Sequence, residues 1–288
     1  MTEDLAIAVR GLRKSYGGTT AVDGVDLDVR QGEVFALLGP NGAGKTTTVE
    51  ILEGYRRRDD GEVRVLGVDP AHADPAWRAR VGIVLQGTGE FDELTVGEVV
   101  AQFARFYPNS EDPVDVIERV GLTAKRRART QSLSGGQKRR LDVALGIVGR
   151  PDLLFLDEPT TGFDPQARQD FWELIRDLAT AGTTILLTTH YLYEAEALAN
   201  RVGVIAAGRL VEVAPPAQLG NRETAPATVR WHGPDGPGSE QTSTPTATVL
   251  ALAQRFENGE IPGLSVTRPT LEDIYLQMIG SNNGEVEK

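Results

Sequence analysis

A glycine-rich segment that directly follows a short apolar run constrains this chain more than any other feature. Residues 39–46 read GPNGAGKT and fit the phosphate-binding pattern Gly-x-x-x-x-Gly-Lys-Ser/Thr. The apolar run at 34–38 precedes this segment, and residues 46–53 have the composition of a helix. Because strand, glycine loop and helix form the context in which such a loop holds phosphates, the sequence predicts a nucleoside triphosphate site here.

Composition excludes several classes of protein. The chain has 288 residues, enough for one large domain or two smaller ones with a substantial core. Its formal net charge of −11 argues against a general nucleic-acid binder, which usually carries a basic footprint. Disulfides and thiolate metal sites are excluded because the chain contains no cysteine. Neither a signal peptide nor an apolar run of about eighteen residues is present, so we expect a soluble, intracellular chain that does not cross a bilayer itself.

Short apolar runs and helical spacings predict an α/β fold. Runs with alternating polarity near the N-terminus are typical of half-buried strands, whereas continuous apolar runs are typical of buried parallel strands. Residues 87–140 are rich in helix formers, and the last two runs form a hairpin around Ala207 and Gly208. We expect strands at 5–10, 22–29, 34–38, 62–66, 81–85, 153–156, 184–187, 202–205 and 210–213, with helices at 46–53 and 171–179.

The composition changes after Pro215. Residues 215–226 and 233–245 are rich in turn and linker residues. Between and after them we expect a strand at 227–231 and helices at 247–256 and 271–279, the last capped by Thr270 with Asp273 and ended by Gly280. The sequence therefore predicts a main domain at 1–220 and a small α+β extension at 221–288.

Further motifs follow the glycine loop in a fixed order. Residues 133–137 read LSGGQ, residues 151–159 read PDLLFLDEP, and His190 follows LLTT. With the glycine loop, these motifs resemble the ATP-binding cassette (ABC) family of transport ATPases over roughly residues 5–215. The resemblance implies an α/β phosphate-loop NTPase core, an N-terminal antiparallel β subdomain, a helical subdomain at about 87–140, and an ATPase that uses ATP and Mg²⁺.

The glycine loop supplies the expected phosphate contacts. Backbone amides of residues 41–46 can surround a β-phosphate at a helix N-terminus, and glycine lets the backbone approach closely. Lys45 is expected to span the β- and γ-phosphates, and the Thr46 hydroxyl to ligate Mg²⁺. The alternative is a glycine turn with a surface lysine. The expected ATP-binding residues of this segment are Gly39, Pro40, Asn41, Gly42, Ala43, Gly44, Lys45, Thr46 and Thr47.

Two adjacent carboxylates are the main candidates for chemistry. Asp157 ends the apolar run 153–156, and ligands gather at the carboxyl ends of parallel strands. Its expected task is to hold Mg²⁺ through water. Glu158 is the candidate general base, since a base needs hydrogen-bond reach to the attacking water. An acidic pair after a strand can also serve only as a helix cap, but the neighbouring motifs favour catalysis.

Three more candidates take their roles from the resemblance. Gln86 follows VGIVL and would contact Mg²⁺ or the attacking water and begin the segment that senses a membrane partner. His190 would contact the γ-phosphate and hold the water and Glu158 in place. Tyr16 would stack on adenine, which needs only a ring face. The alternatives are a surface glutamine, a structural histidine, and a core or edge-strand tyrosine.

The LSGGQ segment predicts a second anion site. The Ser134 hydroxyl and the amides of Gly135 and Gly136, at the start of a helix from Gln137, form another anion-binding helix end. The resemblance implies that this cradle closes over the ATP of the opposite subunit in a homodimer, with Asp164 at the same boundary. The alternative is an ordinary glycine-rich helix start.

Three segments resemble the branch of exporters that handle drugs, antibiotics or other hydrophobic or polymeric substrates. They are THYLYEAEAL at 189–198, TTGFDP at 161–165 with its preceding threonine, and PTLEDIYLQMIG at 269–280, although Tyr193 replaces the usual acidic residue. The resemblance implies a separate transmembrane permease as partner and a cytoplasmic location, peripheral on the inner face of the cell membrane.

Other function classes fit the sequence less well. A soluble ABC ATPase acting on ribosomes or nucleic acid usually carries two cassettes or long coiled coils, and this chain has one cassette and no such insertion. A small-molecule kinase with a phosphate loop would lack LSGGQ. Import remains open beside export.

Overall fold

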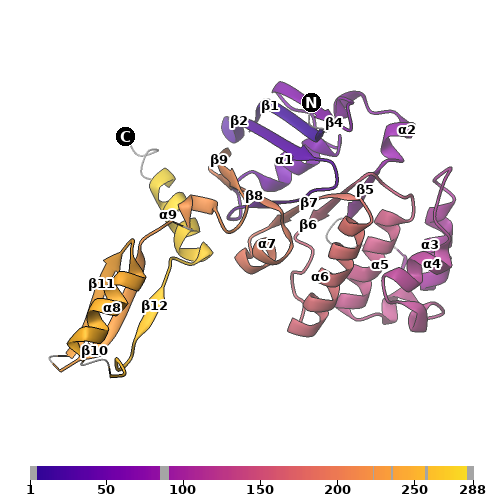
Figure 1. The fold of residues 1–288 in the computed structure, drawn as a ribbon. Helices are drawn as coiled ribbons and strands as arrows, with labels where there is room; N and C mark the ends of the chain where they lie inside the picture. Colours follow the sequence, from indigo (N-terminus) through magenta and orange to yellow (C-terminus); the bar gives the residue numbers. More distant parts are fainter. Residues whose placement is uncertain (1–4, 85–90, 223, 235, 257–258, 284–288) are drawn as a thin grey trace. The chain divides into compact units, whose positions relative to one another are not determined.

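The computed structural model describes residues 5–84, 91–222, 224–234, 236–256 and 259–283 (Figure 1). These residues form two compact units, Met1–Val213 and Ala214–Lys288. The boundary expected from sequence, after residue 220, lies within the short 3-10 helix η5 (Leu219–Asn221) and stays a prediction.

An antiparallel sheet forms the N-terminal part of the first unit. Its strand order is β2-β1-β4, with β1 at Leu5–Tyr16, β2 at Thr19–Arg30 and β4 at Asp60–Val65. β1 is longer than the sequence suggests because Gly17 and Gly18, with φ of 53° and 89°, form a two-residue connection that lets β1 and β2 pair to their ends. Tyr16 therefore lies at the tip of this hairpin.

A six-stranded sheet forms the centre of the first unit, in the order β5-β6-β7-β3-β8-β9. Neighbours from β5 to β8 run parallel, and every residue of β3 and β7 is buried, as expected for strands covered on both faces. The carboxyl ends of β3, β6 and β7 therefore share one edge. The strand bounds are β3 Val34–Leu38, β5 Val81–Val84, β6 Leu153–Asp157, β7 Thr184–Thr189, β8 Arg201–Ala206 and β9 Arg209–Ala214.

Helices cover this sheet and build a helical region beside β5 and β6 (Figure 1). In that region α3, α4 and α5 contact one another. The helix bounds are α1 Lys45–Leu52, α2 Pro75–Arg78, α3 Val96–Ala104, α4 Pro113–Arg119, α5 Gly135–Ile147, α6 Pro165–Thr180 and α7 Leu192–Leu198. Shorter 3-10 turns are η1 Pro70–His72, η3 Thr123–Lys125 and η4 Thr130–Ser132.

Two helices begin earlier than the sequence spacing indicates. α6 starts at Pro165, not at residue 171, because the Asp164 carboxylate accepts a hydrogen bond of 2.8 Å from Ala167 N and proline suits the first helical position. α5 starts at Gly135, not at Gln137, because Ser134 and Gln137 form a reciprocal capping box. Capping side chains thus extend both helices toward the candidate site residues.

The second unit contains a three-stranded sheet in the order β11-β10-β12. Val229, Leu252 and Ile261 form its small core. The interpretation of residues 233–245 as linker is wrong, because β11 pairs with β10 from Ala227↔Thr242 to Gly233↔Gly236 and an edge strand tolerates proline. The bounds are β10 Ala227–Gly233, β11 Gly236–Thr242, α8 Pro245–Arg255, β12 Ser265–Thr267 and α9 Leu271–Asn283.

The last helix confirms its predicted start and corrects its predicted end. Thr270 Oγ1 accepts a hydrogen bond from Asp273 N (3.1 Å), and Asp273 Oδ2 accepts one from Thr270 N (2.8 Å). Gly280 does not end α9, which continues to Asn283. A single glycine costs a helix only about 1 kcal/mol relative to alanine, too little to stop it here.

Within the described ranges, no helix is both long and apolar enough to span a membrane.

Truncation tests whether the first unit folds alone. Its main core cluster runs from Ala6 to Ile205, with Leu210 and Val213 packed against it. We predict that a chain ending after Pro216 stays soluble and unfolds cooperatively on heating, because it keeps this core and all six strands of the central sheet. Circular dichroism against temperature measures this, and an insoluble or non-cooperative product would contradict it.

Candidate functional site

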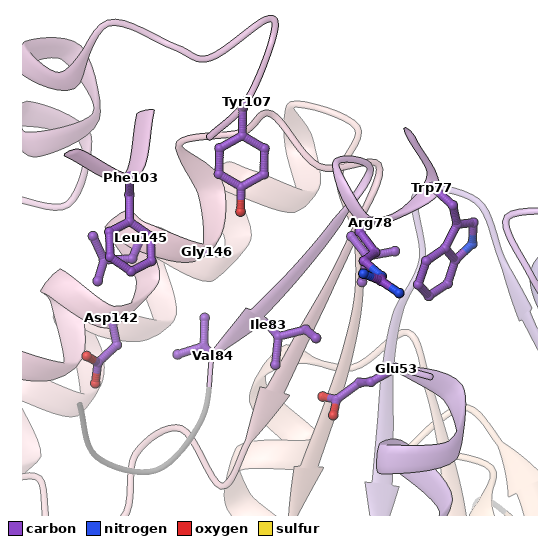
Figure 2. A pocket seen from close by; sticks show the side chains of 11 residues that line it. Glu53, Trp77, Arg78, Ile83, Val84, Phe103, Tyr107, Asp142, Leu145 and Gly146 are labelled. Carbon is purple, nitrogen blue, oxygen red and sulfur yellow. The ribbon is translucent and has the colours of Figure 1, made fainter. Parts of the chain in front are cut away.

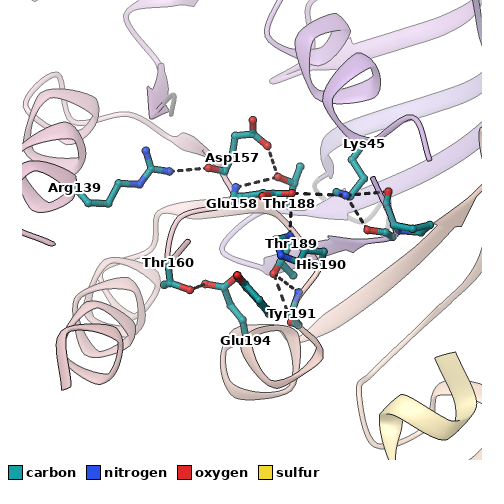
Figure 3. A network of polar contacts seen from close by, with 12 residues as sticks. Lys45, Arg139, Asp157, Glu158, Thr160, Thr188, Thr189, His190, Tyr191 and Glu194 are labelled. Atoms are coloured by element: carbon teal, nitrogen blue, oxygen red, sulfur yellow. Dashed lines mark hydrogen bonds and ion pairs between the residues drawn. The ribbon is translucent and has the colours of Figure 1, made fainter. Parts of the chain in front are cut away.

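Three candidate residues converge at the edge where β3, β6 and β7 end (Figure 3). Lys45 opens α1 after the glycine loop, Glu158 follows β6, and His190 follows β7. The Lys45 ammonium lies 3.8 Å from Glu158 Oε1, and His190 Nδ1 lies 3.1 Å from the same oxygen. One carboxylate oxygen therefore faces both an ammonium and an imidazole.

Close packing explains two glycines of the loop. A Cβ on Gly39 would lie 2.4 Å from the Ile205 carbonyl oxygen, and one on Gly44 would lie 2.4 Å from that of Ala21. Gly44 also has a φ of 103°, which side chains disfavour. These glycines let the loop lie tightly against β8 and β2. A side chain at either position would push the loop away from these strands.

The Lys45 ammonium is held inside this loop. Nζ donates hydrogen bonds to the carbonyl oxygens of Gly39 (2.7 Å) and Pro40 (3.2 Å), and the residue is only 5% exposed. Burial lowers the pKa of Lys45, whereas the charges of Glu158 and Asp157 oppose that shift. The structure therefore does not show a surface lysine. A buried cation beside a helix N-terminus fits the phosphate groups of ATP.

Thr188 on β7 fixes the acidic pair, and the sequence analysis missed it. Its hydroxyl donates to Asp157 Oδ1, and Glu158 N donates to both the carbonyl and the hydroxyl oxygens of Thr188, each at 3.1 Å. Thr188 is fully buried, which is unusual for a polar residue. The signal available in the sequence was a threonine that directly continues the apolar run at 184–187. The neighbouring strand thus sets where both carboxylates point.

Two more buried charged residues hold the segment after β6 (Figure 3). Glu194 of α7 accepts a hydrogen bond of 2.8 Å from the Thr160 hydroxyl, and burial raises the pKa of Glu194. Arg139 of α5 donates to the carbonyl oxygens of Asp157 (2.7 Å) and Pro159 (3.1 Å). The sequence analysis missed these contacts, because only the fold brings α5 and α7 to this segment.

Three residues of LSGGQ, Ser134, Gly136 and Gln137, line one hollow together with Asp164. Ser134 Oγ accepts a hydrogen bond from Gln137 N at 3.4 Å, and Gln137 Oε1 accepts one from Ser134 N at 3.1 Å. The chain thus brings the two predicted motifs, 133–137 and 161–165, to one place. Gly135 lines another recess, together with Glu158, Thr161, Gly162 and Phe163.

Tyr16 and Gln86 are the remaining sequence candidates. Tyr16 is 39% exposed, with Lys14 Nζ 5.3 Å and the Arg56 guanidinium 5.2 Å from its ring centroid, so it is not a core tyrosine. Gln86 falls outside the described residues. Its suggested roles at Mg²⁺ and at a membrane partner stay predictions.

A second hollow opens between β5, α3 and α5 (Figure 2). Its lining is mostly apolar and aromatic, including Trp77, Phe103 and Tyr107, but it also contains the carboxyl groups of Glu53 and Asp142. Burial raises the pKa of Glu53 to about 8, and the negative charges of Asp157 and Glu50 add to this shift. Glu53 therefore carries a proton in the folded chain near neutral pH.

Comparison with known proteins decides the family. The family model described as ABC transporter matches residues 22–161. The Nod factor export ATP-binding protein I of Ralstonia nicotianae is 38% identical to this chain, covering 95% of the chain and 94% of that protein. The chain belongs to the ABC transporter ATPases.

Other ABC proteins support the assignment. The daunorubicin/doxorubicin resistance ATP-binding protein DrrA of Streptomyces peucetius is 45% identical over 72% of this chain and 64% of that protein. The solved structure of cbiO1 from Clostridium perfringens, part of an ABC transporter complex, has a TM-score of 0.68 and 28% identity, covering 75% of this chain and 90% of that one. The predicted α/β cassette fold is confirmed.

As an ABC ATPase, this chain binds and hydrolyses ATP as the nucleotide-binding subunit of a transporter. The comparisons give no support to the alternative of an ABC ATPase that acts on ribosomes or nucleic acid.

The raised pKa of Glu53 predicts how stability depends on pH. The folded chain keeps this proton up to about pH 8, whereas the unfolded chain loses it near 4.5, so the stabilisation is complete below 4.5 and is lost as pH rises toward 8. We predict that Glu53→Gln removes this loss. Urea unfolding of both proteins at pH 5.5, 7 and 8.5 measures it, with the exposed Glu118→Gln as control. A free-energy difference between wild type and Glu53→Gln that stays constant with pH would contradict the assignment.

Proposed function

We propose that this chain powers an exporter of drugs, antibiotics or other hydrophobic or polymeric substrates. The ABC family also includes importers, so the proposed direction of transport rests on the similar proteins. Two of them are named for Nod factor export and for daunorubicin and doxorubicin resistance. The full-length coverage of the first relative supports carrying its direction of transport to this chain.

The observation that supports hydrolysis at this site is the position of Glu158 Oε1, which lies 3.1 Å from His190 Nδ1 and 3.8 Å from Lys45 Nζ. We infer that Glu158 is the general base that takes a proton from the attacking water. His190 orients that carboxylate and contacts the γ-phosphate. The Lys45 charge stabilises the negative charge on the transferred phosphoryl group, where a buried cation acts more strongly than in water.

The oxygen donors fit a magnesium ion. Mg²⁺ prefers carboxylate, hydroxyl and water oxygens together with substrate phosphates, and Asp157 and Thr46 supply the first two. When bound with ATP, it neutralises charge on the phosphate oxygens. Thr188 holds the Asp157 carboxylate in one orientation, and Gln86 joins the set by its place in the family's pattern.

We further propose that the chain works as a homodimer with shared ATP sites. Lys45 and the hollow of Ser134 and Asp164 offer separate anion sites within one chain. A second subunit explains both, because the Ser134 end of one chain then closes over the ATP held by Lys45 of the other. Tyr16, exposed at its hairpin tip, offers a ring face to adenine.

A separate permease completes the proposed transporter. Among the described residues no helix spans a membrane, and the similar cbiO1 is part of a transporter complex. The chain would then lie on the inner face of the cell membrane, held there by its permease.

Replacing the proposed base separates binding from turnover. We predict that Glu158→Gln keeps ATP affinity and lowers kcat by about 10²–10⁴, because the amide is nearly isosteric but cannot accept the proton. The variant should accumulate as an ATP-bound dimer on gel filtration. Turnover within threefold of wild type would remove Glu158 from this role.

Mixing two inactive variants tests the shared sites. Lys45→Ala and Ser134→Arg are each expected to be inactive alone. In a mixed dimer one site collects both defects and the other collects none. Random mixing makes about half of the dimers mixed, so about a quarter of wild-type activity should return if the sites act independently.

The control for this mixture is a dimer of wild type with Glu158→Gln. If that control turns over while the Lys45→Ala and Ser134→Arg mixture stays inactive, and mixed dimers are shown to form, the shared-site model is wrong. Recovery on mixing excludes a site contained in one chain.

A further inference from the structure

Arg139 makes contacts that none of the family motifs discussed above assigns. It lies on α5, five residues after the Ser134 cap, and is only 7% exposed. Its Nη2 donates to the Asp157 carbonyl oxygen at 2.7 Å (Figure 3). Its Nε donates to the Pro159 carbonyl oxygen at 3.1 Å. Its Nη1 also lies 3.9 Å from Asp142 Oδ2. The two carbonyl groups belong to the residues on either side of Glu158.

The backbone at Glu158 needs such support. Its φ of 42° lies in the left-handed region, which is unfavourable for a residue with a side chain and persists only where the surroundings hold it. Thr188 holds the Glu158 amide, and Glu194 holds Thr160 two residues later. Arg139 holds both flanking carbonyls, because a planar guanidinium can donate to two acceptors at once.

We propose that Arg139 is a positioning residue that aims the Glu158 carboxylate of its own chain at the attacking water. This inference rests on the proposed role of Glu158. Arg139 itself does not touch ATP or water. The hydrogen bonds from Arg139 connect the backbone around Glu158 to α5. The orientation of the Glu158 carboxylate therefore depends on the helix that Ser134 caps.

Kinetics give the first test. Arg139→Gln should lower kcat about 10- to 100-fold, because misplacing a reacting group by about 1 Å costs up to 10²-fold. The Kd for ATP should stay within twofold of wild type, since Lys45 and the glycine loop are unchanged. Arg139→Lys should recover part of the loss, because an ammonium can serve these carbonyls with less exact geometry.

The matched control is Arg176→Gln, which removes an exposed arginine of α6 that also donates to a backbone carbonyl, that of Ala197 at 3.3 Å. Its kcat should stay within twofold of wild type. An Arg139→Gln protein with wild-type kcat, or one with kcat and ATP affinity lowered in parallel and no recovery in Arg139→Lys, overturns the positioning role.

Mixed dimers test which Glu158 is served. If Arg139 positions Glu158 of its own chain, Arg139→Gln impairs the ATP site that contains Lys45 of the same chain. Arg139→Gln mixed with Ser134→Arg should then leave one intact site and about a quarter of wild-type activity. Arg139→Gln mixed with Lys45→Ala should leave no intact site, so only the low residual activity of Arg139→Gln sites remains. The reverse pattern shows that Arg139 acts through Ser134 at the partner's site and overturns the proposal.

Hydrogen exchange separates this inference from the shared-site model. In nucleotide-free protein, amides of residues 157–163 should exchange at least tenfold faster in Arg139→Gln than in wild type or Arg176→Gln. This difference does not depend on whether dimers form. If the Lys45→Ala and Ser134→Arg mixture stays inactive, only the shared-site model is contradicted. Hydrogen exchange and the comparison of kcat with Kd still test the role of Arg139. Unchanged exchange in this segment overturns the inference.

Discussion

The Lys45 ammonium is removed from water at the edge where three parallel strands end. Two backbone carbonyls and the nearby Glu158 carboxylate offset the loss of hydration, which by itself lowers the pKa of Lys45. The glycine loop must lie tightly against β2 and β8 to place those carbonyls, so the loop, the sheet and the acidic segment depend on one another. The same buried charge is available to an incoming polyphosphate, which offers more negative charge than the groups it replaces.

Local patterns were sufficient to predict the parts of the fold that follow from short-range chemistry. The strand before the glycine loop, the strand that ends at Asp157, and the capping of α9 by Thr270 and Asp273 all depend on neighbours within a few residues. The convergence of Lys45, Glu158 and His190 was predictable because parallel strands place their carboxyl ends on one edge.

Contacts between distant segments were not predictable in the same way. β11 contains glycine, proline and serine and forms because β10 offers a complete antiparallel partner, not because its residues favour a strand. Arg139 and Glu194 look like surface residues of amphipathic helices until the fold places them against the segment after β6. Thr188 lies 31 positions from Asp157, so only strand pairing shows that it fixes that carboxylate.

The capping box at Ser134 adds a condition to the proposed dimer. Its backbone N–H already donates to the Gln137 side chain, and its hydroxyl already accepts from Gln137 N. A phosphate that approaches this helix end must replace the side-chain oxygen of Gln137 with its own. Since a net hydrogen bond is worth about 1 kcal/mol, the exchange costs little, and the amides of Ser134 and Gln137 stay paired in the free subunit. Self-capping therefore suits a helix end that, in the proposed dimer, gains and releases the partner's nucleotide in every cycle.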